Sequence, residues 1–164
     1  MSLEELREQN IRLVTEKALE CFIKNGINNT RVSEIAAASG LTQRSVFRYF
    51  PSKDDIVIAA AFCYWERTKA YIARELRRHT DDAQTGIEQI NIILNSYANM
   101  LFVDPEGIRF SLDAEVALYS VGKNAHVINR PPERYEAYKG PLSQAVRRGL
   151  ADGTVDPGEN IKQL

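Results

Sequence analysis

Residues Thr30–Lys53 read T-R-V-S-E-I-A-A-A-S-G-L-T-Q-R-S-V-F-R-Y-F-P-S-K. The pattern predicts two short helices joined by a tight turn at Gly40, because glycine adopts positive φ without a steric penalty. Pro51 has no backbone N–H to donate and therefore ends the second helix. The segment is predicted to fold as two helices that cross at about 90–120° through a short turn.

The residues at the predicted crossing have the sizes that close packing of two helices requires. Ala36 is small, so the second helix can approach the first closely at this position. Ile35, Leu41 and Val46 are apolar and are expected to fill the wedge between the two helices. This combination is typical of a helix-turn-helix, whose second helix enters the major groove of DNA.

Polar residues begin both predicted helices. Thr30 is expected to cap the first helix and Thr42 the second, because threonine favours the position just before a helix. Gln43, Arg44 and Ser45 then form the first turn of the second helix and face away from the wedge. An arginine in this place can bind guanine through two hydrogen bonds, and a glutamine can bind adenine. The segment therefore has the chemistry of a base-reading surface.

The charge of the chain gives limited support to DNA binding. The net charge is −1, but residues 1–53 contain eight Lys/Arg and six Asp/Glu. A local excess of positive charge can bind phosphates, although its long-range attraction is weak. The alternative is a helical hairpin in which the side chains of Gln43, Arg44 and Arg48 are simply solvated.

A wider set of positions, over about Val14–Ile58, fits one known family. The set comprises Ala18, Phe22, Gly26-Ile27, Thr30, Val32, Ile35-Ala36, Ala38, Gly40-Leu41-Thr42, Ser45-Val46-Phe47, Tyr49-Phe50 and Ser52-Lys53. With these residues the chain resembles the TetR family of bacterial transcriptional regulators. The resemblance implies a homodimer that binds a palindromic operator in double-stranded DNA, usually as a repressor. It also implies a small-molecule effector that binds the C-terminal helices and shifts the helix after Pro51.

The resemblance also assigns DNA contacts to individual positions. The DNA-facing set is Arg31, Ser33, Thr42, Gln43, Arg44, Ser45, Phe47, Arg48, Tyr49 and Lys53. Position 47 is usually a tyrosine whose hydroxyl binds a phosphate, and this chain has Phe47 instead. Tyr49 and Arg48 are expected to take over that contact.

The spacing of apolar residues is helical along the whole chain, so the expected fold is all-α. A three-helix DNA-binding domain is expected at 1–51, and a helical ligand-binding and dimerisation domain at 52–164. The first helix is expected at Leu3–Lys24, with Gly26 as its left-handed cap.

Two long helices are expected next. One runs from Ser52 to about Arg78, and Ser52 with Asp55 resembles a capping box. The other is expected at Thr85–Phe102. Its apolar seam consists of Ile87, Ile90, Leu94, Tyr97 and Leu101.

Three further helices are expected in the C-terminal part. A helix at 106–121 follows a cap at Asp104-Pro105; it is apolar on two faces and is therefore expected to be buried on both. Another starts near Glu133, and Pro141 must kink or split it. The last begins at Asp156-Pro157. It has barely started at the final residue of the chain, so the dimerisation body is expected to be truncated.

A regulator of this kind needs an effector cavity in its C-terminal helices. The candidate lining residues are Tyr64, Trp65, Tyr97, Met100, Phe110, Asp113, Tyr119 and Tyr138. An aromatic stripe at helical spacing is more often core than cavity lining. Asp113 could receive a cationic ligand, but it could equally pair with Arg109 or Arg134, or face solvent.

Other classes of protein fit the sequence poorly. No Ser/His/Asp order, metal-ligand cluster or phosphate-binding glycine loop appears, so an enzyme, a metal site and a cofactor are not expected. Cys21 and Cys63 lie on apolar stretches and are interpreted as buried. No apolar run reaches roughly 18 residues and the N-terminus is acidic, which favours a cytoplasmic protein without membrane contact. The rival interpretation is a helical protein-interaction or ligand-binding module that does not bind DNA.

Overall fold

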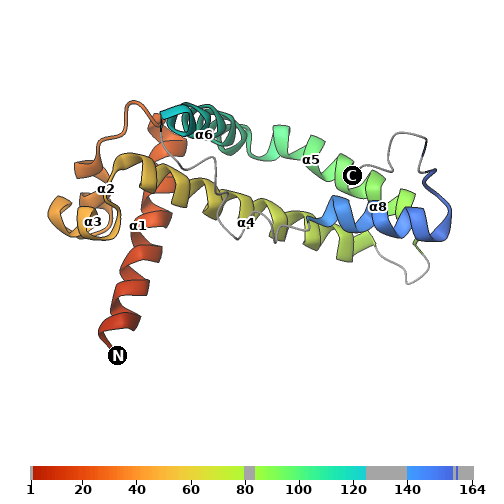
Figure 1. Ribbon diagram of the computed structural model, residues 1–164, viewed down its shortest axis with the longest axis horizontal. Coiled ribbons are helices and arrows are strands. Elements are labelled where there is room, and N and C mark those ends of the chain that lie inside the picture. The colour runs from red at the N-terminus through yellow and green to blue at the C-terminus, as the bar shows by residue number, and fades with distance from the viewer. Residues whose placement is uncertain (1, 80–83, 125–139, 157, 159–164) are drawn as a thin grey trace. The chain divides into compact units, whose positions relative to one another are not determined.

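The described part of the chain is helical throughout (Figure 1). The computed structural model describes residues 2–79, 84–124, 140–156 and 158. In these ranges there are seven α-helices and no strand, which confirms the expected fold class. The helices are α1 Leu3–Asn25, α2 Val32–Ala38, α3 Gln43–Tyr49, α4 Lys53–His79, α5 Gly86–Val103, α6 Pro105–Asn124 and α8 Pro141–Asp152. Within the same ranges, no helix is both long and apolar enough to cross a lipid bilayer.

α1 starts with a capping box and ends at a glycine. The Ser2 hydroxyl accepts a hydrogen bond from the N–H of Glu5 at 3.1 Å, and the Glu5 carboxylate accepts one from the N–H of Ser2 at 2.6 Å. This reciprocal pair satisfies two N–H groups at the helix start. The N–H of Gly26 donates to Phe22 O at 2.8 Å. Gly26 has a positive φ of +83°, but its ψ of 155° is extended and not left-handed helical as predicted.

The chain forms two compact units, and each has its own core. Among the described residues the first unit contains 2–66 and 104–124, and the second contains 67–79, 84–103 and 140–156. α4 is one continuous helix of 27 residues that contributes to both units. Its predicted capping box is present, since the Asp55 carboxylate accepts a hydrogen bond from the N–H of Ser52 at 2.8 Å and the Ser52 hydroxyl accepts one from the N–H of Asp55 at 3.2 Å.

An aromatic stack joins α1, α4 and α6 within the first unit. Phe22 of α1 and Phe110 of α6 are stacked with 6.0 Å between ring centroids. Tyr64 of α4 meets Phe110 edge-to-face at 6.1 Å. All three side chains are buried, and ring pairs of this kind contribute about 0.5–1.5 kcal/mol each beyond the area they bury. The stack holds α6 against the helix that precedes the helix-turn-helix.

α6 is buried on one face only. Its start agrees with the sequence, because Asp104 Oδ1 accepts a hydrogen bond from the N–H of Gly107 at 3.0 Å and Pro105 occupies the first helical position. Phe110 is 2% exposed, whereas Leu112 is 62% exposed. The prediction that both faces are buried was therefore wrong. α6 packs against α1 and α4 on one side, and Leu112 lies on the other side.

The two cysteines are less enclosed than the sequence predicts. Cys21 and Cys63 are free thiols and are half-buried. Burial raises the pKa of Cys21 above its usual value, which keeps this thiol protonated and weakly reactive.

α5 and α8 lie side by side in the second unit (Figure 1). Ile72 of α4, Ile93 of α5 and Ala145 of α8 form the buried core of this unit. The two helices approach closely at two glycines, because a Cβ on Gly86 would overlap the backbone nitrogen and Cα of Gly149. Gly86 therefore cannot carry a side chain without a shift of the backbone, and the contact fixes the rotation of α5 about its axis.

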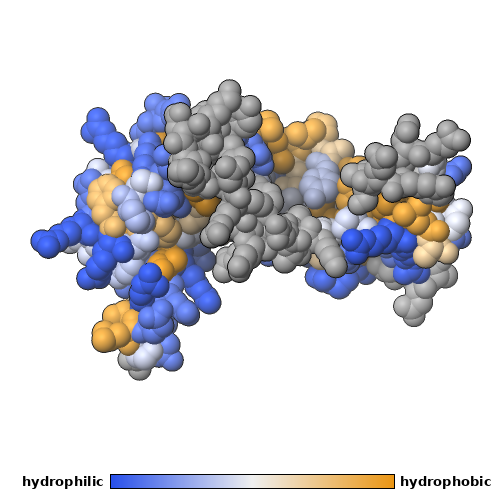
Figure 2. All heavy atoms as spheres, viewed as in Figure 1, coloured by the Kyte–Doolittle hydropathy of each residue, from blue (hydrophilic) through white to orange (hydrophobic). Residues whose placement is uncertain are grey.

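The predicted apolar seam of α5 was wrong for all of its residues except Ile90, which packs against the core. The exposed members are Ile87, Leu94, Tyr97 and Leu101. The buried face consists instead of Gly86, Ile93, Ser96 and Met100. α5 is apolar on both sides, so periodicity alone could not select the buried one. Figure 2 shows the resulting exposed hydrophobic side chains over α5.

The C-terminal helix begins at a proline. The sequence predicts a helix from Glu133 that Pro141 kinks or splits; residues 125–139 lie outside the described ranges, and α8 starts at Pro141 itself. Proline fits the first helical position because the N–H it lacks would have no partner there. α8 ends at Gly153, which is left-handed with φ +76° and ψ 9°.

The turn after α8 caps the start of α5. Asp152 Oδ2 accepts a hydrogen bond from the N–H of Gly86 at 2.7 Å, and the Thr154 hydroxyl accepts one from the N–H of Ile87 at 3.2 Å. Asp152 Oδ1 also accepts hydrogen bonds from the hydroxyl and N–H of Thr154. The Thr154 hydroxyl and the N–H of Gly86 lower the pKa of Asp152 below its usual value. Residues far apart in the chain thus satisfy the N–H groups that open α5.

Replacing Asp152 with Asn should change how stability depends on pH. Because the folded-state pKa is lowered, the carboxylate stabilises the fold above about pH 4, the usual pKa of an aspartate, and this contribution is lost as the pH falls through the folded-state pKa. Thermal unfolding should give a lower midpoint for Asp152→Asn than for the original chain at neutral pH. The difference should shrink below about pH 4.

Asp156→Asn is the matched control, because Asp156 accepts a hydrogen bond from the N–H of Gly158, two residues away, and makes no bond to α5. Its midpoint should follow that of the original chain at every pH. A difference for Asp152→Asn that stays constant down to about pH 2 would contradict a role for the charged carboxylate.

Candidate DNA-binding surface

A hydrogen-bonded glycine turn joins α2 to α3. The N–H of Leu41 donates to Ala36 O at 2.9 Å, and the N–H of Gly40 donates to Ala37 O at 3.1 Å. This pair of bonds is the Schellman arrangement, which satisfies carbonyls at the end of α2 and requires a left-handed residue after the helix. Gly40 supplies it with φ +66°.

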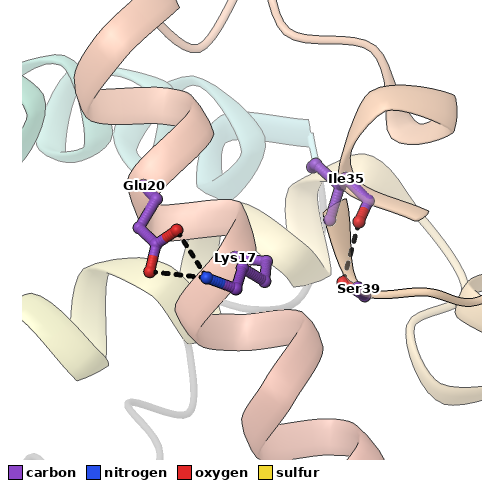
Figure 3. Close-up of polar contacts among 4 residues, drawn as sticks. All are labelled: Lys17, Glu20, Ile35 and Ser39. Atoms are coloured by element: carbon purple, nitrogen blue, oxygen red, sulfur yellow. Dashed lines mark hydrogen bonds and ion pairs between the residues drawn. The ribbon is translucent and has the colours of Figure 1, made fainter. Parts of the chain in front are cut away.

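The wedge between the two helices is buried as predicted. Ile35 and Val46 are fully buried, and Ala36 is 2% exposed. Leu41 is half-buried at the edge of the wedge. At the end of α2 the Ser39 hydroxyl donates to Ile35 O at 2.7 Å, so this buried polar group has its partner inside the unit (Figure 3).

Of the two predicted threonine caps, the one at Thr42 is present and the one at Thr30 is not. Thr42 caps α3, since its Oγ1 accepts a hydrogen bond from the N–H of Ser45 at 3.1 Å. The prediction that Thr30 caps α2 was wrong. The Thr30 hydroxyl is buried and donates backwards, to Gly26 O at 2.8 Å and to Cys21 O at 3.2 Å. Arg31 occupies the cap position of α2 instead, and its N–H donates to the Glu34 carboxylate at 2.8 Å.

The side chains predicted to face DNA point away from this wedge. Seven of them are exposed: Arg31, Ser33, Thr42, Gln43, Arg44, Phe47 and Arg48. The other three are half-buried: Ser45, Tyr49 and Lys53. Across the described ranges, no hydrogen bond or ion pair engages the side chains of Gln43, Arg44 or Lys53. Figure 2 shows mostly hydrophilic side chains around α2 and α3, together with a small hydrophobic patch.

Tyr49 is held by two neighbours at the end of α3. Its hydroxyl oxygen lies 3.1 Å from Asn10 Nδ2 and 3.1 Å from Arg48 Nη2. The guanidinium carbon of Arg48 also lies 5.2 Å from the centre of the Tyr49 ring. The hydrogen bond from Arg48, and to a smaller extent that from Asn10, lowers the pKa of Tyr49. Asn10 was missed by the sequence analysis, because α1 gives no local signal of a contact with α3.

Comparison with known proteins agrees with this geometry. Residues 14–60 match the family model described as bacterial regulatory proteins, tetR family, a segment that contains the whole helix-turn-helix. This segment is similar to the DNA-binding domain of TetR-family regulators. α2 and α3 lie within the matched segment and correspond to the helix-turn-helix of that domain.

Individual relatives support the same fold. The fatty acid metabolism regulator protein of Bacillus subtilis (strain 168) is 21% identical over 149 residues, which are 91% of this chain and 72% of that protein. A candidate transcriptional regulator from Pseudomonas aeruginosa PAO1 has a TM-score of 0.61 at 19% identity, covering 91% of this chain and 69% of that one. The regulator FadR from Bacillus subtilis, crystallised with stearoyl-CoA, has a TM-score of 0.53 at 15% identity, covering 93% and 77%.

The residues predicted to line an effector cavity are scattered. Tyr64 and Phe110 contact each other in the core of the first unit, and Trp65 is half-buried and meets Phe62 edge-to-face at 5.5 Å. In the second unit Met100 is 6% exposed and Tyr97 is 38% exposed. The remaining two predicted positions are Tyr138, outside the described residues, and Tyr119, whose side chain is outside them.

Asp113 lines a groove in the first unit. The groove has a volume of about 650 Å³ and lies among the segment after α1, the start of α4 and one side of α6. Asp54 and Asp113 bring carboxylates to it and Arg109 brings a guanidinium. Arg109 Nη2 also donates to Ile23 O at 3.2 Å, so α6 is tied to the end of α1.

Substitution of Gly40 separates backbone conformation from packing. No atom lies within 4 Å of a Cβ placed on Gly40, so Gly40→Ala should destabilise the fold only through its positive φ, by about 1–2 kcal/mol. Gly40→Asn should destabilise it less, because asparagine enters the left-handed region more readily. Urea unfolding of the three proteins measures both differences. Equal losses for the two variants would contradict the assignment to backbone conformation.

Proposed function

We propose that the chain is a sequence-specific DNA-binding repressor that releases its operator when a small molecule binds. The observation that carries the proposal is the start of α3. Gln43 and Arg44 are exposed there without partners in the described part of the chain, and the buried residues of the wedge hold the helix in place. The N-terminal side chains of a recognition helix are those that reach base edges.

The side chains around α3 divide into two groups by their chemistry. Arg44 can donate two hydrogen bonds to one guanine, and Gln43 can bind an adenine in the same manner. The flanking residues are suited to phosphates, which set the position of the protein on DNA without reading its sequence. These are Arg31, Ser33, Thr42, Ser45, Arg48, Tyr49 and Lys53, whereas Phe47 can make only apolar contact with DNA.

A palindromic operator requires two copies of this surface. TetR-family regulators bind DNA as dimers, and two recognition helices must lie about 34–36 Å apart to enter successive major grooves. We therefore propose a homodimer as the DNA-binding form. The effector would act by changing this separation through α4, which begins directly after the helix-turn-helix and continues without a break into the second unit.

An acyl-CoA is the effector class best supported by the relatives. One structural relative was crystallised with stearoyl-CoA, and one sequence relative regulates fatty acid metabolism. In the second unit, apolar residues of α5 remain exposed, including Leu94, Leu101 and Phe102 at 51%, 57% and 84%. An acyl chain bound over such residues would remove apolar surface from water, at about 25 cal/mol per Å².

The proposal is tested by fluorescence anisotropy with a duplex selected by the protein from a randomised pool. Binding should exceed that to unrelated duplexes by roughly 10³-fold or more and should weaken steeply with salt. Stearoyl-CoA should release the duplex, whereas coenzyme A without the acyl chain should not. Binding that lacks sequence preference and salt dependence would favour the alternative, a helical interaction or ligand-binding module without DNA binding.

Two substitutions separate base reading from phosphate binding. Arg44→Ala should reduce the free energy of binding to the selected duplex by about 1–3 kcal/mol and relax the sequence preference at one base pair of each half-site. Lys53→Ala should lower the affinity for all duplexes alike, and it should lower the slope of log affinity against log salt by about one per contact. Arg147→Ala, which removes the same charge from the exposed face of α8, is the control and should change neither quantity. Uniform weakening by both test variants would contradict the assignment of base reading to Arg44.

A further inference from the structure

The contact between Asn10 and Tyr49 places a side chain of α1 at the end of α3. Asn10 Nδ2 and the Tyr49 hydroxyl oxygen are 3.1 Å apart, and both residues are half-buried. Arg48 Nη2 approaches the same oxygen at 3.1 Å from the exposed side. Three side chains from two helices therefore meet at one phenolic oxygen.

The directions of these hydrogen bonds determine what the hydroxyl can still do. An amide NH₂ and a guanidinium are donors only, so the Tyr49 oxygen accepts both bonds through its lone pairs. The phenolic proton is used by neither neighbour. Both bonds withdraw electron density from the oxygen, which makes the O–H group a stronger donor and agrees with the lowered pKa of Tyr49. The hydroxyl is thus prepared to donate to an external acceptor.

The surroundings favour an anion as that acceptor. Arg48 keeps its positive charge directly beside the hydroxyl and stacks on the Tyr49 ring, so the two groups can be donors to the same anion. Arg7, three residues before Asn10 on α1, adds a further positive charge that acts on Tyr49. DNA phosphates are the anions that a recognition helix meets along its length.

We infer that Asn10 is a positioning residue, which holds the Tyr49 hydroxyl beside Arg48 so that its proton is donated to a DNA phosphate. This inference rests on the proposed DNA binding, and it gives α1 an indirect role in that binding. Asn10 itself makes no contact with DNA in this arrangement. Its effect passes through one hydroxyl group, and this gives the inference a specific test.

The test is a double-mutant cycle on the full chain, with Asn10→Ala, Tyr49→Phe and the double variant. Affinity for the selected duplex and for an unrelated duplex of equal length is measured by anisotropy across a salt series. Each single variant should lower the affinity for both duplexes by about tenfold per contact, because the hydrogen bond from the Tyr49 hydroxyl to a charged phosphate is lost. The double variant should bind as the singles do.

The salt series distinguishes the loss of a neutral hydrogen bond to DNA from the loss of a positive charge. Asn10 and Tyr49 are neutral, so their variants should leave the slope of log affinity against log salt unchanged. Arg48→Ala should lower the slope by about one per contact. Gln9→Ala is the matched control, because Gln9 is the adjacent exposed amide on α1 and should not affect affinity.

The possible outcomes separate this inference from the proposed function. If the original chain binds no duplex, both fail. If the original chain binds, the effect of Asn10→Ala is compared in two backgrounds. If Asn10→Ala lowers the DNA affinity of the Tyr49→Phe variant as much as it lowers that of the original chain, Asn10 acts elsewhere and the inference is overturned. Tyr49→Phe retains the ring and its packing, so undiminished affinity in that variant, with an unchanged unfolding midpoint, would overturn it as well.

Discussion

The recognition surface depends on the burial of a few apolar side chains between two very short helices. α2 and α3 have seven residues each, and isolated helices shorter than about 12–15 residues are barely stable in water. Full burial of an isoleucine or valine side chain contributes about 1.5–3 kcal/mol. Ile35, Ala36 and Val46 provide this burial at the crossing. The exposed polar residues of α3 have defined positions only because these three are inside.

Thr30 connects this wedge to α1. The last carbonyls of a helix have no partners within it, and the Thr30 hydroxyl donates to two carbonyls near the end of α1. The prediction that Thr30 caps α2 was wrong, because its hydroxyl bonds backwards and Arg31 occupies the cap position. A hydroxyl can accept a hydrogen bond from the helix that follows or donate one to the helix before. Burial of Thr30 against α1 decides between the two, and burial is a property of the fold.

Contacts within a short segment could be predicted from the sequence, whereas contacts between distant segments could not. The turn at Gly40, the cap at Thr42 and the cap at Asp104 are confirmed because each depends on residues within one or two turns of helix. The buried face of α5 was predicted wrongly, because the contact that selects it joins Gly86 to Gly149. The contacts of Asn10 with Tyr49 and of Arg109 with Ile23 O were missed for the same reason, since each joins helices that are distant in sequence.

The near-neutral charge of the chain gives individual contacts a large share of any affinity for DNA. A net charge of −1 provides little long-range attraction, and residues 1–53 have only two more basic than acidic side chains. Affinity must then come from donors placed at short range, and those need not be charged. A neutral hydroxyl polarised by Asn10 and Arg48 would bind a phosphate without releasing a counterion of its own. The contact between Asn10 and Tyr49 would in this way supply part of the binding free energy that a more basic protein obtains from lysine and arginine.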